Sequence, residues 1–309
     1  MLSTDNKRWS FKVKKHQLKA LIALAESGSI RGAARDMGLS QSALTKTLRE
    51  LETQTGAALL VRASRGTRFT PAGKVLVDHA RLILTSMRRA EEEVRRISGQ
   101  AIATARIAVT PVVAVTKLGG IIHEFQRRHP QGQLDVETGT LGNIVPRLLD
   151  GQLDLALGIA TPEALPADLA FQPFTEVTIS PVSRSKRFAN RIVTWEELAG
   201  ERWLLNPSPG SADQVALDWL TQKKITLAHP PTLCRSPFLL AALNRSTDLI
   251  AFCPPQILND SFWGSGLCPI DVPDLPPKMQ LGVLTRRYTP NSLVSRDIID
   301  ISTRLIGSI

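Results

Sequence analysis

The stretch AESGSIRGAARDMGLSQSALTKTLRELETQTGAALLVRASRGTRFTPAG, residues 25–73, carries signals for two short helices and a hairpin in direct succession. Ser29 is placed to cap a first helix, and Gly38 is the residue type that ends one. Ser40 is placed to cap a second helix over residues 41–56. Two helices joined by a short turn that contains glycine predict a helix-turn-helix unit.

An amphipathic helix is predicted just before this unit. Within residues 14–27, apolar side chains recur at spacings of three and four, which places them on one helix face. These side chains are Leu18, Leu21, Ile22 and Ala25. The same spacing predicts that the second helix of the unit turns Ala43, Leu44, Thr47, Leu48 and Leu51 inward.

The polar side chains of that second helix are candidate DNA contacts, because this helix of the motif enters the major groove. Glutamine and arginine present paired groups that match adenine and guanine edges, serine and threonine suit phosphates or bases, and lysine suits the backbone. The predicted contacts are Ser40, Gln41, Ser42, Thr45, Lys46 and Arg49. The alternative is an ordinary solvated helix face.

Residues 57–70 form two β-prone runs around a basic turn, which predicts a hairpin wing. Arg62, Arg65 and Arg68 would lie along phosphates or in the narrow minor groove, where the negative potential is strongest. A solvated hairpin without DNA contact is the alternative.

The net positive charge is confined to the N-terminal third. The chain of 309 residues has a formal net charge of +10. Residues 1–99 hold 19 Lys and Arg against 9 Asp and Glu, whereas residues 100–309 hold 19 basic and 19 acidic residues. This asymmetry predicts a polyanionic partner for the N-terminal third, with double-stranded DNA as the leading candidate. The chain shows neither an apolar run of membrane-spanning length nor a signal-peptide core, so we expect a cytoplasmic protein without a membrane partner.

A long helix is predicted from Pro71 to residue 99. Its apolar residues alternate steps of four and three, the a/d seam of a coiled coil, and the opposite side is strongly charged. The seam residues are Leu76, Ala80, Ile83, Met87, Ala90, Val94 and Ile97. The seam predicts pairing with a second copy, and packing onto its own domain is the alternative.

From Arg106 onward, short apolar runs alternate with helical segments, which is typical of a parallel sheet with crossover helices. The sequence predicts strands at 106–110, 134–139, 153–159, 178–183, 202–207, 249–255 and 278–287. It predicts helices at 118–130, 144–151, 195–200, 211–224, 236–244 and 292–306.

Residues 25–73 resemble the DNA-binding region of LysR-type transcriptional regulators. The matching positions are Gly28-Ser29, Ala33-Ala34, Leu39-Ser40-Gln41, Ala43, Leu51-Glu52, Gly56, Leu59, Arg62, Thr70 and Gly73. The departures are Ser42, Thr45 and Leu60-Val61, and they make the bases contacted less transferable. Farther along, RLLDGQLDLAL and WEELAGERWLL are similar to segments of the same family's effector domain, so the resemblance covers nearly the whole chain.

The resemblance implies a multidomain α/β protein. A winged helix-turn-helix would span 14–70, a linker helix 71–99, and a periplasmic-binding-protein-like effector domain 100–309. This effector domain would have two α/β subdomains, about 106–175 with 275–309 and about 176–274, joined by two crossing hinge strands. The implied function is DNA-binding transcriptional regulation switched by a small-molecule effector. The expected partners include further copies of the chain, as a homodimer or homotetramer, and RNA polymerase is a further candidate.

The effector is expected between the two subdomains, at strand C-termini and helix N-termini. The predicted effector-binding residues are Thr110, Pro111, Thr140, Leu141, Asn206, Ser208, Arg235 and Ser236. Because helix N-termini and Arg235 favour negative charge, we expect a small organic anion. The alternative is that Thr110 and Thr140 are only helix caps.

Two other function classes remain open. A thiol-redox switch would use one of the cysteines, with Cys234 and Cys268 in predicted loops and Cys253 in an apolar strand. A solute-binding or enzymatic protein with an incidental basic N-terminus is the other class. Because the chain lacks GxxxxGK[ST], GxSxG and HExxH, we expect no catalytic residue, metal or cofactor.

Overall fold

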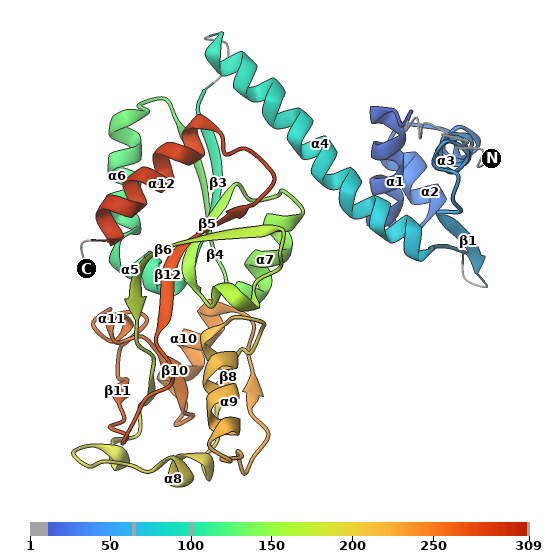
Figure 1. The fold of residues 1–309 in the computed structure, drawn as a ribbon. Coiled ribbons are helices and arrows are strands. Elements are labelled where there is room, and N and C mark those ends of the chain that lie inside the picture. The colour runs from blue at the N-terminus through green and yellow to red at the C-terminus, as the bar shows by residue number, and fades with distance from the viewer. Residues whose placement is uncertain (1–11, 64–65, 99–101, 308–309) are drawn as a thin grey trace, which may run out of the picture. The chain divides into compact units, whose positions relative to one another are not determined.

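The structure is a computed structural model that describes residues 12–63, 66–98 and 102–307. It divides into two compact units, one within residues 1–92 and the other within residues 93–309 (Figure 1). Each unit has its own hydrophobic core. Within the described ranges, no helix has both the length and the apolar character needed to cross a membrane.

The first unit is a three-helix group followed by a hairpin and the start of a long helix. Its elements are α1 (Lys15–Ser27), α2 (Ile30–Asp36), α3 (Gln41–Thr55), β1 (Leu60–Ala63), β2 (Gly66–Phe69) and α4 (Pro71–Ile97). Both predicted caps are confirmed, because Ser29 Oγ accepts the Gly32 N–H at 3.0 Å and Ser40 Oγ accepts the Ala43 N–H at 3.1 Å. The fold therefore contains the predicted winged helix-turn-helix.

The core of the first unit corrects the prediction that the whole apolar seam of α4 faces a second copy. Leu21, Leu44 and Leu51 are fully buried in it, and Leu76 and Ala80 of α4 are buried in the same cluster. The first part of the predicted dimer seam therefore packs against its own unit, because α4 begins as a wall of that core. Farther along α4, exposed apolar side chains remain at Ile83, Met87 and Val94.

Ala43 was expected to face inward, but it is exposed. It lies in the first turn of α3, and the buried side chains of that helix begin one residue later, at Leu44. The inward face of α3 is therefore Leu44, Leu48 and Leu51, with Thr47 half-buried.

The second unit contains a five-stranded sheet in the order β4-β3-β5-β12-β6. The prediction of a parallel sheet is wrong for part of it: β3 pairs in parallel with β4 and β5, but β12 pairs antiparallel with β5 and β6. We call this sheet and its helices the large lobe. Its elements are β3 (Thr104–Val109), α5 (Pro111–Thr116), α6 (Leu118–Arg128), β4 (Gln133–Thr138), α7 (Leu141–Leu149), β5 (Leu155–Ala160), β6 (Leu169–Val177), β12 (Met279–Arg286) and α12 (Leu293–Ile306).

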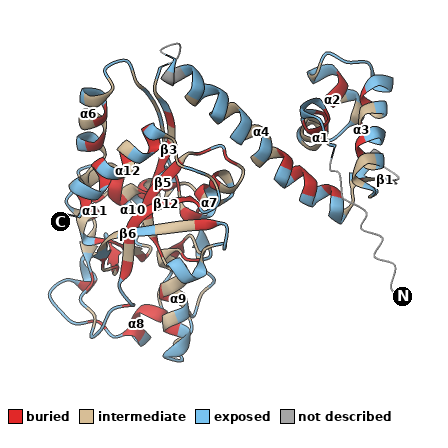
Figure 2. Cartoon of the chain, turned by 45° about the horizontal axis from the view of Figure 1, so that its top comes forward, coloured by how far each residue is buried: buried red, intermediate tan, exposed pale blue. Residues whose placement is uncertain are grey.

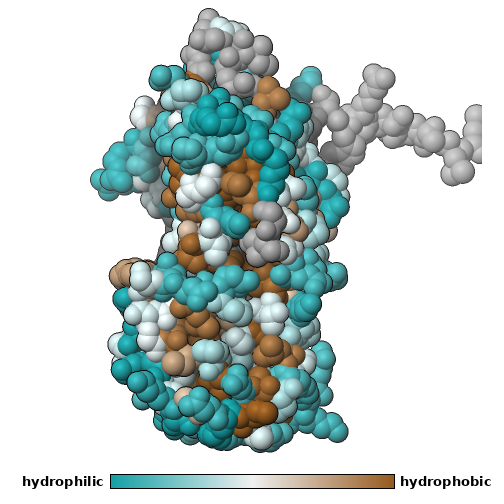
Figure 3. All heavy atoms as spheres, turned by 90° about the vertical axis from the view of Figure 1, so that its left-hand side faces the viewer, coloured by the Kyte–Doolittle hydropathy of each residue, from teal (hydrophilic) through white to brown (hydrophobic). Residues whose placement is uncertain are grey.

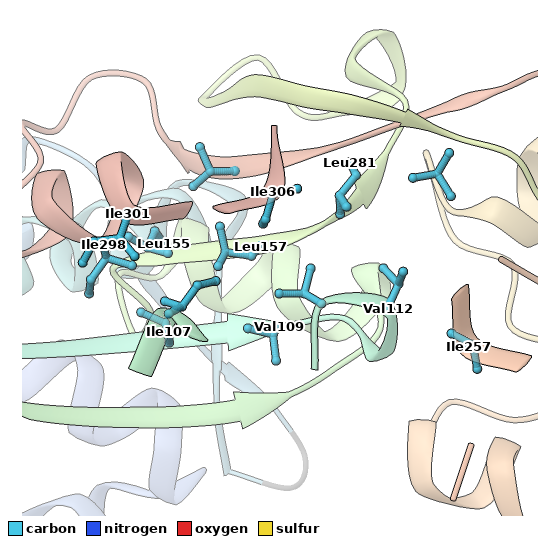
Figure 4. Packing of buried hydrophobic residues seen from close by; sticks show 14 of the residues in the cluster. Ile107, Val109, Val112, Leu155, Leu157, Ile257, Leu281, Ile298, Ile301 and Ile306 are labelled. Carbon is cyan, nitrogen blue, oxygen red and sulfur yellow. The ribbon is translucent and has the colours of Figure 1, made fainter. Parts of the chain in front are cut away.

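Helices cover both faces of this sheet, and alternate strand residues supply the two cores. Ile107 and Leu155 pack with Ile298 of α12 on one face, as Figure 4 shows. Ala108 packs with Ile144 of α7 on the other face. The central strands are correspondingly buried along their length, red in Figure 2.

The small lobe lies between β6 and β12 in the chain, and both strands lead into it. It contains the sheet β10-β7-β11 and the short parallel pair β8-β9. Its elements are β7 (Ser180–Ser183), α8 (Trp195–Ala199), β8 (Leu204–Leu205), α9 (Ala212–Gln222), β9 (Thr232–Leu233), α10 (Pro237–Ser246), β10 (Ala251–Cys253), α11 (Pro255–Leu258) and β11 (Cys268–Pro269). On the face shown in Figure 3, hydrophobic residues reach the surface in patches between hydrophilic ones.

Candidate DNA-binding surface and effector site

The outward face of α3 gathers the predicted DNA contacts. Gln41, Ser42, Lys46 and Arg49 are exposed, and Thr45 is half-buried between them. One shallow groove follows this face. Its lining is Gln41, Ser42, Thr45, Lys46, Arg49, Glu50, Thr53 and Gln54. The last three were not predicted, although helical spacing is the signal that finds them: Glu50 and Thr53 lie four residues after Lys46 and Arg49, and Gln54 lies four after Glu50.

Hydrogen bonding separates these residues into two groups. Ser40 Oγ caps α3 and lies 2.9 Å from Ser42 Oγ, and Thr45 Oγ1 donates to the Gln41 carbonyl at 2.7 Å. These hydroxyl groups already have partners within the helix. The side chains with the longest reach, Gln41, Lys46 and Arg49, form no hydrogen bond or ion pair with another described residue. They are the members of the face that are free to contact DNA.

The wing is a tight hairpin in which Val61 pairs with Arg68 and Arg62 pairs with Thr67. Arg68 is exposed, and Arg62 lies in β1. The predicted contact Arg65 lies outside the described residues. Arg68 is thus the described wing cation available to a phosphate.

Three hydroxyl groups mark the candidate effector site in the second unit. Thr110 follows β3, Thr140 follows β4, and Ser208 lies in the loop between β8 and α9. Thr110 Oγ1, Thr140 Oγ1 and Ser208 Oγ are all buried and have no hydrogen-bond partner among the described residues. Leaving one buried hydroxyl unpaired costs about 1–3 kcal/mol, so a bound molecule with polar atoms would be stabilised by all three.

Both threonines occupy helix N-cap positions, but neither acts as the predicted cap. Thr110 precedes α5 and Thr140 precedes α7, and the side chain of neither accepts a capping bond within the described part of the chain. The interpretation of Thr110 and Thr140 as capping side chains is therefore wrong. The backbone carbonyls accept the N–H groups of the first turn instead, as in Val113 to Thr110 at 3.0 Å.

The two lobes contact each other next to Thr140 and Ser208. Gly142, in the first turn of α7, lies against Ser208, since a β-carbon there would come within 3.1 Å of Ser208 Cβ. The Thr161 N–H donates to the Gly210 carbonyl at 3.1 Å. Asn143 Nδ2 donates to the Arg235 carbonyl at 3.0 Å. The N-termini of α7 and α10 therefore meet at one place, beside Thr140 and Ser208.

The remaining predicted effector residues have other surroundings. Leu141 is 4% exposed and belongs to the large-lobe core, which leaves only its backbone near the site. Ser236 Oγ caps α10 by accepting the Leu239 N–H at 3.4 Å. Arg235 is exposed, and Pro111 is the first residue of α5. Their predicted roles are thus less direct than those of the three unpaired hydroxyl groups.

Asn206 leads to a half-buried acidic residue, Asp213, that the sequence did not indicate. The Asn206 N–H donates to Asp213 Oδ2 at 2.5 Å, and the Ser208 N–H donates to Ser211 Oγ at 3.0 Å. Burial raises the pKa of Asp213 to about 6, against the opposite effect of the Asn206 N–H. Asp213 and Ser211, both at the start of α9, thereby hold the loop that presents Ser208.

Two of the three cysteine thiols, those of Cys234 and Cys253, are buried. Burial, together with the nearby Asp213 charge, raises the pKa of Cys253 to about 12, so this thiol is protonated at neutral pH. Cys234 is buried, and its thiol donates to the Ser236 carbonyl at 3.6 Å. All three cysteines are free.

Both units match family models. Residues 16–74 match the bacterial regulatory helix-turn-helix protein model of the lysR family, and residues 98–305 match the LysR substrate binding domain. The chain therefore belongs to the LysR family of bacterial helix-turn-helix transcriptional regulators.

Individual relatives agree with this assignment. The chain is 30% identical to the HTH-type transcriptional regulator TdcA of Escherichia coli K12 over 58% of its own length, and the match spans 57% of that relative. The crystal structure of ArgP from Mycobacterium tuberculosis has a TM-score of 0.67 at 19% identity, covering 96% of this chain and 99% of that one. Full-length CbnR complexed with its target DNA has a TM-score of 0.64 at 19% identity, covering 94% and 99%. At these identities the two structures show a shared fold.

Proposed function

We propose that the chain is a transcriptional regulator that places α3 in the major groove and its wing along the adjacent backbone. The exposed groups on α3 support this, because glutamine and arginine can form paired bonds to base edges and lysine can pair with phosphate. The confinement of the net charge to the first third supplies the electrostatic part of the affinity. The cytoplasm, where bacterial DNA lies, is the compartment that this function requires.

We propose further that a small organic anion binds between the lobes at Thr110, Thr140 and Ser208. The observation that carries this proposal is a set of three buried hydroxyl groups, on Thr110, Thr140 and Ser208, that have no hydrogen-bond partner among the described residues. Two of them, on Thr140 and Ser208, lie where the lobes meet. The N-terminus of α7 adjoins them and has no acidic residue in its first turn, so its dipole favours a negative group.

A thermal-shift screen of small carboxylates, each paired with its neutral amide, tests this site. A ligand that binds only the folded chain raises its Tm, and we expect carboxylates to act where their amides do not. Thr110→Val should remove the shift. Thr116→Val is the matched control, because Thr116 Oγ1 already donates to the Val112 carbonyl at 2.6 Å within α5. Equal shifts in both variants would place the ligand elsewhere.

We propose that the exposed part of the α4 seam pairs two chains. Ile83, Met87 and Val94 are 41%, 39% and 64% exposed, and they lie at coiled-coil spacing on one helix. A dimer would present two copies of α3 to two half-sites. Association of dimers into a tetramer, and contact with RNA polymerase, are further proposals consistent with a family of oligomeric regulators.

A further inference from the structure

The wing is attached to the recognition helix α3 by one carboxylate. Glu52 Oε1 accepts the N–H of Leu59 at 2.8 Å and the N–H of Leu60 at 3.0 Å. Leu60 is the first residue of β1, so these two bonds connect the last turn of α3 to the base of the hairpin. A two-stranded hairpin of four-residue strands is marginal alone, so its direction depends on such anchors.

The position of Glu52 is locally unfavourable for its own helix. A carboxylate in the last turn opposes the helix dipole, and α3 has no basic residue in that turn to offset it. Charge-assisted hydrogen bonds to two backbone N–H groups are about twice as strong as neutral ones. The stabilisation that Glu52 provides is therefore directed to the wing and not to α3.

A second anchor fixes the other strand of the hairpin to α4. Thr70 Oγ1 donates to the Ala58 carbonyl at 2.7 Å and accepts the Gly73 N–H at 3.0 Å. Gly73 is packed so closely that a β-carbon would lie 2.1 Å from the Leu59 carbonyl oxygen. This anchor fixes the wing to the start of α4, and Glu52 is the anchor that fixes it to α3.

We propose that Glu52 is a positioning residue that sets the wing relative to α3, so that Arg68 and the α3 side chains contact DNA together. Once α3 is bound, a wing already held in position contacts DNA in an intramolecular step and adds to the affinity. A loose wing would lose much of this gain, because binding would have to order it. The inference rests on the proposed contact between the wing and DNA, and the two can fail separately.

A double-mutant cycle on DNA affinity tests the inference with a random-sequence duplex, which needs no knowledge of the operator. We expect Arg68→Ala alone to weaken binding about tenfold, the size of one charge-assisted hydrogen bond. Glu52→Ala alone should weaken binding by about the same factor, and by less than about threefold when Arg68→Ala is already present. If Glu52→Ala only lowered the fraction of folded protein, it would weaken DNA binding by the same factor with and without Arg68→Ala.

Three further variants keep the test decisive. Glu52→Gln retains an acceptor oxygen at the same reach and should restore most of the affinity. Glu52→Asp keeps the charge but shortens the reach, so it should resemble Glu52→Ala and serves if that variant fails to fold. Glu26→Ala, which removes an exposed carboxylate from α1, outside the groove on α3, should bind DNA at least as tightly as the original chain.

Additive losses from Glu52→Ala and Arg68→Ala would overturn the role of Glu52 while leaving the wing contact intact. Unchanged binding by Arg68→Ala would overturn both the wing contact and the positioning role. Binding by Glu52→Gln as weak as by Glu52→Ala would also contradict the inference, because the hydrogen-bond acceptor is then not what matters.

Discussion

Gly142 lies directly against Ser208, with 3.1 Å from a β-carbon built on Gly142 to Ser208 Cβ and 3.3 Å to Ser208 Oγ. The contact joins the first turn of α7 in the large lobe to the loop before α9 in the small lobe. Because Ser208 Oγ is one of the three unpaired hydroxyl groups, side-chain volume at position 142 acts directly on the candidate effector site.

Gly142→Ala is therefore expected to reduce the Tm shift caused by a carboxylate ligand. Without ligand, two effects on the free energy of unfolding oppose each other. Alanine favours a helix by about 1 kcal/mol over glycine, whereas Ser208 must move by a few tenths of an ångström. The free energy of unfolding should therefore fall by no more than the cost of that movement. Gly119→Ala is the matched control, because Gly119 is also the second residue of a helix and has open space beyond it. A full ligand shift in Gly142→Ala would contradict the placement of the site.

Asp213→Asn should change how stability depends on pH. The pKa of Asp213 is raised to about 6 in the folded chain from an ordinary 3.8. Protonation of Asp213 therefore stabilises the folded state, and this contribution is complete below about pH 4. That contribution is lost as the pH rises through 6. Asparagine can still accept the Asn206 N–H without a buried charge, so we expect up to about 3 kcal/mol more stability at pH 8. Urea unfolding at pH 4 to 8 measures this, and parallel pH profiles for both chains would contradict it.

Iodoacetamide labelling with mass spectrometry distinguishes the thiol hypothesis from an effector switch. We expect Cys268, which is partly exposed, to react in the folded chain, and Cys234 and Cys253 to react only after denaturation. Peroxide should then leave DNA affinity unchanged. Rapid labelling of native Cys253, together with loss of DNA binding, would restore the redox-switch hypothesis.

Met87→Glu should separate a dimer formed through α4. Met87 is 39% exposed at the centre of the seam, and a partner helix would bury the new carboxylate without a counter-charge. Sedimentation velocity at low micromolar concentration should show the mass halved. Arg88→Glu, next to it on α4, is a control for added negative charge, although it also removes the Arg88–Glu92 ion pair. An unchanged mass for Met87→Glu would mean that the chains pair through another surface.

The helix-turn-helix was predictable because its signals are local. Ser29 and Ser40 each cap a helix by their own side chain, and the glycines at 28 and 56 adopt the left-handed conformation that ends α1 and α3. The apolar spacing of α3 predicted its buried Leu44, Leu48 and Leu51, apart from Ala43 in the first turn. On α1 it predicted Leu18 and Leu21, but Ile22 and Ala25 are only half-buried, and the buried Ala20 and Leu24 were not predicted.

The second unit was less predictable where tertiary contacts decide the structure. Strand β6 was not predicted, because Pro173 interrupts its alternating pattern. The sheet tolerates Pro173 because β6 is an edge strand and because its pairing with β12 shifts register there, between Leu281 and Gly282. Helix α5 has the β-branched sequence PVVAVT, yet it is helical because Pro111 starts it and Val112 and Val113 pack into the core. No sequence pattern indicates that Thr110 leaves its hydroxyl group unpaired.

Selection of bound sequences from a random duplex library, with the original chain and with Gln41→Ala, tests the central claim most directly. If α3 contacts bases, the original chain will enrich one sequence motif, and Gln41→Ala will lose preference at a defined position, at a cost of about 1–3 kcal/mol, while still binding non-specifically. Enrichment of no motif by the original chain, or of an identical motif by both chains, would contradict the assignment of Gln41 on α3 to sequence recognition.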